Sequence, residues 1–245
     1  DLKGLGRDQI KELQLERLQL TCNRAYSRVD FYRKRFDEIG LLPEDIKDLD
    51  NLDKFPFTTQ EDLANHYPYG MFAVPLKDIV RIKYSRSVGE SPIVIGYTKK
   101  DVKIWTQLMA RLMHSIGIHK RDIVQIAFAY TLFIVGFTST EGAMKLGALV
   151  IPTGSGAVTS SERQIQIAHD WGTTVMGCTG SYMLHLAEVA KKMGFDPRRD
   201  FKIRISFHTA EPLTPQMRKD IEEIWGLSLI HISEPTRLGM RSYAV

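Results

Sequence analysis

The stretch IVQIAFAY (residues 123–130) is a short apolar run that is followed by GFTSTEGAMKL (136–146) and then by ALVIP (148–152). The length and β-branched residues of the first stretch are typical of a buried strand, the second predicts a helix, and the third predicts another strand. Strands that are separated by single helices form βαβ units, in which the strands run parallel. The stretch therefore predicts an α/β fold with a mostly parallel sheet flanked by helices.

The same alternation continues to residue 225. The predicted helices cover residues 160–169, 181–193 and 215–225, and the predicted strands cover residues 173–177 and 203–208. Sheets of this kind bind their ligands at the carboxyl ends of the strands. We therefore expect the chemistry in the loops after Tyr130, Gly177 and His208.

The first part of the chain has a different pattern. Apolar residues recur at helical spacing from about Arg7 to Phe36, which predicts one long amphipathic helix or two. A threonine before Glu61 and Asp62 can cap a further helix. Short β-leaning runs follow at residues 72–74, 79–82 and 93–95, and a helix is predicted from residue 98 to about residue 116.

Composition excludes several classes of protein. With 245 residues, 43% hydrophobic and 25% charged, the chain is typical of globular proteins. Its net charge of +4 comes from Lys and Arg spread among nearly as many Asp and Glu, which indicates a solvated surface and no nucleic-acid partner. Cys22 and Cys178 lack disulfide or zinc spacing, and no apolar run approaches the roughly 18 residues of a membrane span. We expect a cytoplasmic protein with no membrane partner.

The composition changes at Ser228. The segment SLIHISEPTR (228–237) matches the translation of a transposase-type sequencing-library adapter, and SYAV (242–245) fits the flanking adapter sequence. The alternative is an ordinary strand from Leu229 to Ile232 with a turn at Pro235. We expect residues 228–245 to be a non-native tail and the biological sequence to be cut short near Leu227.

Short motifs are spread along the chain up to Leu227. They are QLERL (14–18), FTT (57–59), YPYG (67–70), MFAVPL (71–76), GYT (96–98), FAYTLF (128–133), ERQ (162–164), SYML (181–184) and AEP (210–212). No single motif is decisive, but together, in this order and spacing, they resemble the phenylacetate-coenzyme A ligase family of adenylate-forming enzymes. The resemblance implies the N-terminal large domain of such an enzyme, truncated at the C-terminus, with a helical region at residues 1–70 and an incomplete α/β AMP-binding core at residues 71–227.

The family resemblance also implies an activity. It is the ATP-dependent activation of an aromatic carboxylic acid, phenylacetate or similar, to an acyl-adenylate, followed by transfer to coenzyme A with release of AMP and pyrophosphate. The implied cofactors of this acid–thiol ligase are ATP, Mg²⁺ and coenzyme A, and a homodimer is left open. The family's Tyr-Gly-x-x-Glu segment and its C-terminal domain with the catalytic lysine are absent, so no catalytic residue is assigned. We expect this chain alone to be inactive.

A loop rich in hydroxyl groups, SRSVGESP (85–92), joins two β-leaning runs. Hydroxyl and backbone N–H donors around Gly89 can hold phosphate oxygens, although such a loop is more often a simple turn. By the resemblance it is the ATP phosphate loop, with Ser85, Arg86, Ser87 and Gly89 as binding residues. Arg86 and Ser87 stand where the family has Ser-Gly, and Ser91 either takes the lysine position or is an insertion. Our hypothesis is that Arg86 replaces part of the missing positive charge.

The turn Ala210-Glu211-Pro212 follows a predicted strand, and by the resemblance it lines the adenine pocket. Its alternative is the N-terminus of a helix that Thr214 caps, with Pro215 in the first turn.

The resemblance assigns the acyl pocket to residues that follow two other strands. They are Tyr130, Phe133, Gly136, Ser181 and Tyr182, with Gly154-Ser155-Gly156 as a turn nearby. Core packing is the alternative for the aromatic residues, and helix capping is the alternative for Ser181. The seven histidines show no metal-binding spacing, so we expect no metal held by protein ligands alone.

Two other functions stay open. The altered loop at residues 85–92 favours a non-catalytic relative that binds a nucleotide or an acyl ligand. An adenylating ligase that uses a different acid or a different acceptor has the same chemistry, and the sequence does not separate it from a phenylacetate enzyme.

Overall fold

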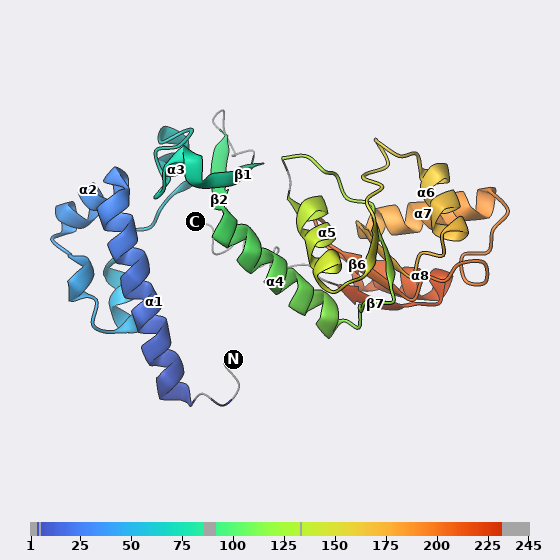
Figure 1. Cartoon of the computed structure of the whole chain (residues 1–245), viewed down its shortest axis with the longest axis horizontal. Helices are drawn as coiled ribbons and strands as arrows, with labels where there is room; N and C mark the ends of the chain where they lie inside the picture. Colours follow the sequence, from blue (N-terminus) through green and yellow to red (C-terminus); the bar gives the residue numbers. More distant parts are fainter. Residues whose placement is uncertain (1–3, 5, 86–91, 133, 232–245) are drawn as a thin grey trace. The chain divides into compact units, whose positions relative to one another are not determined.

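The computed structural model describes residues 4, 6–85, 92–132 and 134–231 (Figure 1). It divides into two compact units, Asp1–Lys100 and Asp101–Val245. The predicted boundary after residue 70 lies earlier than this division, because the hairpin that follows residue 78 groups with the helices before it. That the AMP-binding core begins at residue 71 stays a prediction. No helix among the described residues is both long and apolar enough to cross a membrane.

Helices dominate the N-terminal unit. Its elements are α1 (Arg7–Arg28), α2 (Asp30–Ile39), the 3₁₀ helices η1 (Pro43–Asp45) and η2 (Leu49–Lys54), α3 (Gln60–Asn65), η3 (Leu76–Asp78), β1 (Ile79–Ser85) and β2 (Ile93–Thr98). The long amphipathic stretch forms two helices, because the backbone at Val29 is extended. Cys22, Phe36 and Ile46 form the small core beneath them.

Two predictions for local structure have different outcomes in this unit. Thr59 caps α3 as expected, since its hydroxyl accepts a hydrogen bond from the Asp62 backbone N–H at 3.1 Å. The predicted strand at residues 72–74 is wrong, because Ala73 and Val74 form a bend ahead of η3 and Phe72 lies in irregular backbone. Strands β1 and β2 form an antiparallel hairpin, with Lys83 opposite Ile95.

The C-terminal unit alternates strands and helices. Its elements are α4 (Lys99–Ser115), β3 (Ile123–Ile126), α5 (Val135–Lys145), β4 (Leu149–Ile151), α6 (Ser161–Asp170), β5 (Val175–Cys178), α7 (Gly180–Lys192), β6 (Ile205–His208), α8 (Pro215–Trp225) and β7 (Ser228–His231). All neighbouring strands are parallel, in the order β4-β3-β5-β6-β7. The predicted α/β fold with a mostly parallel sheet is confirmed.

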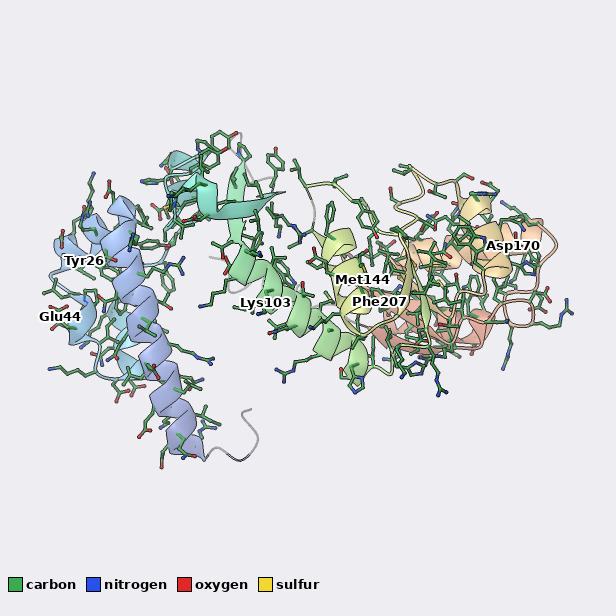
Figure 2. The ribbon with its side chains drawn as sticks, viewed as in Figure 1. Tyr26, Glu44, Lys103, Met144, Asp170 and Phe207 are labelled. Atoms are coloured by element: carbon green, nitrogen blue, oxygen red, sulfur yellow. The ribbon has the colours of Figure 1, made fainter. Side chains whose placement is uncertain are left out.

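The sheet has a hydrophobic layer on each face. Val124, Ile126 and Phe207 pack with residues of α4 and α5 on one face, whereas Met176 and Cys178 pack with α6, α7 and α8 on the other (Figure 1). Side chains alternate between faces along a strand, so both layers require apolar residues at successive positions. Phe207 accordingly lies among the strands, and the exposed Asp170 lies at the end of α6 (Figure 2).

The strand order places a switch point between β3 and β5. The chain runs from β3 to β4 on one side and then returns to β5 on the other side. Successive connections diverge there, and open α/β sheets bind ligands in the crevice this creates at the carboxyl ends of the strands. The loops after Ile126 and after Cys178 border this switch point.

Strand β7 contains the first residues of the predicted tail. It pairs with β6, so that Ser228 lies opposite Ile205. This agrees with the alternative of an ordinary strand over residues 229–231 of the expected range 229–232. Strand pairing does not test whether a segment belongs to the natural protein, so the non-native origin of residues 228–245 stays a prediction. Residues 232–245 lie outside the described residues.

Candidate site at the carboxyl ends of three strands

Three neighbouring strands carry most of the expected site residues that the structure describes. Strand β3 leads to Tyr130 and Gly136, β5 leads to Ser181 and Tyr182, and β6 leads to the turn at residues 210–212. Because β3, β5 and β6 are adjacent and parallel, their carboxyl ends lie along one edge of the sheet. The topology therefore gathers residues as far apart in the sequence as Tyr130 and Pro212.

The turn after β6 contacts the start of α7 directly. The Glu211 carboxylate accepts hydrogen bonds from the backbone N–H of Ser181 through Oε1 and from the Ser181 hydroxyl through Oε2, the latter at 2.8 Å. Gly180 allows this approach, since a Cβ on it would lie 2.6 Å from Leu213 Cδ1. The structure thus joins an expected nucleotide-binding residue to an expected acyl-pocket residue.

The cap of α7 is not the expected one. Ser181 lies inside the first turn, and the N-cap is Thr179, whose hydroxyl accepts a hydrogen bond from the Tyr182 backbone N–H at 3.4 Å. The capping alternative for Ser181 is therefore wrong, because the helix begins one residue earlier than predicted. By contrast, Thr214 caps α8 as expected, at 3.1 Å from the Met217 backbone N.

Tyr182 contacts the glycine turn between β4 and α6. A Cβ on Gly156 would lie 2.8 Å from the Tyr182 hydroxyl, which itself shares a hydrogen bond of 3.1 Å with the Ser161 hydroxyl. Burial raises the pKa of Tyr182. The phenol is therefore neutral at physiological pH, and the residue is half-buried.

A buried polar network holds this glycine turn in place. Gln164 Nε2 donates to the Gly154 carbonyl at 2.8 Å, and Gln164 Oε1 accepts from Thr153 Oγ1 at 2.7 Å and from Gln125 Nε2 at 2.9 Å. Thr173 Oγ1 completes the network by donating to Gln125 Oε1 at 2.9 Å. Sequence reasoning missed this role. The available signal was a polar residue on the buried face of a helix, because Gln164 lies on the face of α6 that also carries Ile165 and Ala168.

Tyr130 and Gly136 meet where α5 begins. A Cβ on Gly136 would lie 2.8 Å from the Ala129 carbonyl oxygen and 3.2 Å from the Tyr130 ring. The Tyr130 hydroxyl shares a 2.6 Å hydrogen bond with Thr140 Oγ1, and burial raises the pKa of this phenol. Tyr130 is thus held by Thr140 in the loop after β3, whereas Tyr182 follows β5 on the other side of the switch point.

The thiol of Cys178 lies at the end of β5 and is fully buried. Burial, followed by the charge of Glu211, raises its pKa. A thiol in this environment stays protonated, so it is a packing residue and not a nucleophile.

The remaining expected residues lie largely outside the described part. Arg86, Ser87 and Gly89 of the expected phosphate loop, and Phe133 of the expected acyl pocket, are outside it, and Ser85 is described only as the last residue of β1. A pocket of about 280 Å³ lies in the N-terminal unit between α1, α2 and residues 52–58, and no expected site residue lines it. The described residues contain no cluster of His, Cys, Asp or Glu that could hold a metal ion.

Curated proteins and solved structures similar to this chain were found, whereas family models gave no match. The chain is 40% identical over 225 residues to a phenylacetate-coenzyme A ligase of Pseudomonas putida, covering 92% of this chain and 50% of that protein. It is 39% identical over 231 residues to a phenylacetate-coenzyme A ligase of Aromatoleum evansii, covering 94% of this chain and 52% of that protein.

Solved structures agree with these relatives. An open conformation of 2-hydroxyisobutyryl-CoA ligase, in complex with 2-HIB-AMP and CoA, superposes with a TM-score of 0.84 and 28% identity, covering 93% of this chain and 54% of that one. The chain thus spans about half the length of the relatives that it matches. The predicted resemblance to the phenylacetate-coenzyme A ligase family is confirmed over almost the whole of this chain.

Proposed function

We propose that the full-length protein activates an aromatic carboxylic acid with ATP as an acyl-adenylate and transfers the acyl group to coenzyme A. The observation that carries the proposal is the 40% identity to a phenylacetate-coenzyme A ligase over 92% of the chain. The switch point between β3 and β5, with aromatic residues on both of its borders, supports it independently.

The residues of this chain have positioning roles in the proposal. The turn Ala210-Glu211-Pro212 lies along the adenine ring, and Tyr130 and Tyr182 form the walls of a slot for the aryl group. Fixed walls hold the carboxylate in line with the α-phosphorus, and orientation of this kind lowers the barrier without any bond to the protein. Apolar burial of the aryl group supplies most of its affinity.

The proposed reaction also requires that the negative charge of the ATP phosphates be balanced. Mg²⁺ offsets the phosphate charge when bound, and coenzyme A accepts the acyl group. Ser85, Arg86, Ser87 and Gly89 are proposed to hold the ATP phosphates, with Arg86 supplying charge. A cytoplasmic location also belongs to the proposal. Whether the protein is a homodimer stays open, and sedimentation of the purified protein tests it.

Pyrophosphate release with ATP, Mg²⁺ and phenylacetate is the direct test. We expect turnover by the full-length protein and none by the 245-residue chain. The proposed activity would be contradicted if the folded full-length protein released no pyrophosphate with any acid in a panel.

One specific observation favours a different acid. The solved ligase with 28% identity is named for 2-hydroxyisobutyrate, which is small and aliphatic, although it has the same fold over 93% of this chain. If the substrate is of that kind, 2-hydroxyisobutyrate gives a higher kcat/KM than phenylacetate in the same panel. If the protein is instead a non-catalytic relative, restoring the family's Ser-Gly at residues 86 and 87 yields no turnover.

A further inference from the structure

Glu211 and Ser181 connect two parts of the proposed site that are thirty residues apart. Glu211 belongs to the turn after β6, and Ser181 belongs to the first turn of α7. Both oxygens of the carboxylate are used, one by the backbone N–H and one by the hydroxyl of the same residue. Such a two-point contact fixes the orientation of a side chain as well as its distance.

The contact satisfies a backbone donor at the start of α7. The first backbone N–H groups of a helix have no partner within the helix. Thr179 Oγ1 accepts from the N–H of Tyr182, and Glu211 accepts from the N–H of Ser181. A carboxylate at this end of a helix is also favoured by the helix dipole. The turn after β6 is therefore part of the cap of α7.

The backbone of the turn is held in an unusual conformation. Ala210 has a φ of 75°, in the left-handed region that a residue with a Cβ rarely adopts. Such conformations persist where the surrounding contacts determine them. The two hydrogen bonds of the adjacent Glu211 and the close packing of Leu213 on Gly180 are contacts of this kind.

We infer that Glu211 is a positioning residue: by holding Ser181, it fixes the turn at residues 210–212 against the segment that carries Tyr182. This inference rests on the proposed function. In that function the turn borders the adenine ring and Tyr182 borders the acyl group. Glu211 thus sets the distance between the nucleotide and the acyl group, and a displaced turn impairs the use of both substrates together.

Four variants of the full-length protein test this inference by pyrophosphate release. Glu211→Ala is expected to raise KM for both ATP and the acid and to lower kcat/KM by about 10- to 100-fold, because small displacements of reacting groups are costly. Glu211→Gln is expected to stay within about threefold, since an amide can accept the N–H and donate to the hydroxyl. Ser181→Ala, which keeps the backbone bond, is expected to lose a few-fold, and Glu211→Ala combined with Ser181→Ala is expected to equal Glu211→Ala alone.

The opposite pattern overturns the inference. If Glu211→Gln is as damaging as Glu211→Ala while Ser181→Ala has no effect, the charge of Glu211 acts on the substrate and not through Ser181. Additive losses in the double variant would lead to the same conclusion. Glu188→Ala is the matched control, because it removes an exposed carboxylate from α7, the helix that carries Ser181.

Amide hydrogen exchange separates failure of this inference from failure of the proposed function. It needs no activity, so it can use the 245-residue chain. Glu211→Ala is expected to speed exchange at the Ser181 amide by about tenfold, because a hydrogen bond to a charged acceptor is lost. Unchanged exchange in Glu211→Ala would overturn the inference even if the protein is an active ligase. Faster exchange in an inactive protein would support the contact and contradict only the proposed function.

Discussion

At the scale of single residues, Asp122 is a buried carboxylate with several hydrogen-bond donors around it. It is 2% exposed at the start of β3 and accepts hydrogen bonds from Arg204 Nη2 at 2.6 Å, Thr174 Oγ1 at 2.7 Å and the His119 backbone N at 2.8 Å. Burial alone would raise the pKa of this carboxyl, but the hydrogen bonds from Arg204, His119 and Thr174 outweigh burial and lower it. Asp122 therefore joins β3 to the segment that leads into β6.

Arg204→Ala leaves this carboxylate buried without its main partner. We expect the free energy of unfolding to fall by about 2 to 3 kcal/mol, below the usual figure for a fully buried pair because Arg204 is 41% exposed. Denaturant unfolding monitored by circular dichroism measures this. Arg199→Ala, which removes an exposed partner of Asp200, is the control and should leave the midpoint unchanged. Equal effects of the two variants would contradict the assigned role of Asp122.

The same residue predicts a pH dependence. The folded pKa of Asp122 lies below its ordinary value of 3.8, so its contribution to stability is fully present above that value and is lost as the pH falls through the folded pKa. The stability difference between the wild type and Arg204→Ala should therefore shrink below about pH 4. Urea titrations at pH 6 and pH 3 compare the two proteins. If the stability difference between the two proteins grew as the pH fell, it would contradict the lowered pKa of Asp122.

At the scale of elements, the network around Gln164 positions the glycine turn that Tyr182 contacts. Gln164→Met has nearly the same volume but removes the side-chain hydrogen bonds to Gln125, Thr153 and the Gly154 carbonyl. Gln125 keeps its bond to the Gln164 backbone carbonyl and Thr153 keeps its bond to the Ile126 carbonyl. We expect a loss of about 2 to 4 kcal/mol in the free energy of unfolding, because several buried polar groups lose hydrogen bonds together.

Gln166→Met is the matched control for this prediction. Gln166 lies on the same helix and bonds only the exposed Asp170 among the contacts that the structure describes. We expect its melting temperature to stay within about 2 °C of the wild type, because surface substitutions change little. If the melting temperature of Gln164→Met also stays within about 2 °C of the wild type, the network does not hold the turn.

Element types followed from the sequence more reliably than element ends. The apolar run 123–130 predicts one strand, but β3 ends at Ile126. Beyond it Ala127 still donates to the Gly177 carbonyl at 2.8 Å, and Phe128 packs on Phe207 with ring centroids 6.0 Å apart. Those residues are apolar because they pack in the core, and periodicity does not separate core packing from strand pairing.

Site residues show the same limit. The sequence located the segments after β3, β5 and β6, because strand ends in a parallel sheet share one edge. It did not predict that Glu211 bonds Ser181, or that Thr179 caps α7. The contact of Glu211 with Ser181 depends on the distance between separate loops, which local sequence patterns do not contain. The cap by Thr179 is local, and it was missed because the ends of helices are the least reliable part of a sequence-based assignment.

At the scale of the whole molecule, the account depends on the strand order. The order β4-β3-β5-β6-β7 creates one switch point, and the residues on its borders are those that the family resemblance assigns to the substrate. The chain spans about half the length of its relatives, so the full-length protein is the proper object of any functional test.

The measurement that tests the central claim most directly is calorimetric titration of the full-length protein with a non-hydrolysable phenylacetyl-adenylate mimic. We predict saturable binding of one molecule per chain, about tenfold weaker in Tyr182→Ala, because an aromatic wall is lost. Binding should be unchanged in Trp171→Ala, which removes an aromatic side chain that is 57% exposed after α6. Absence of binding by a folded wild-type protein, or equal binding by the wild type and Tyr182→Ala, would contradict a site at the carboxyl ends of β3, β5 and β6.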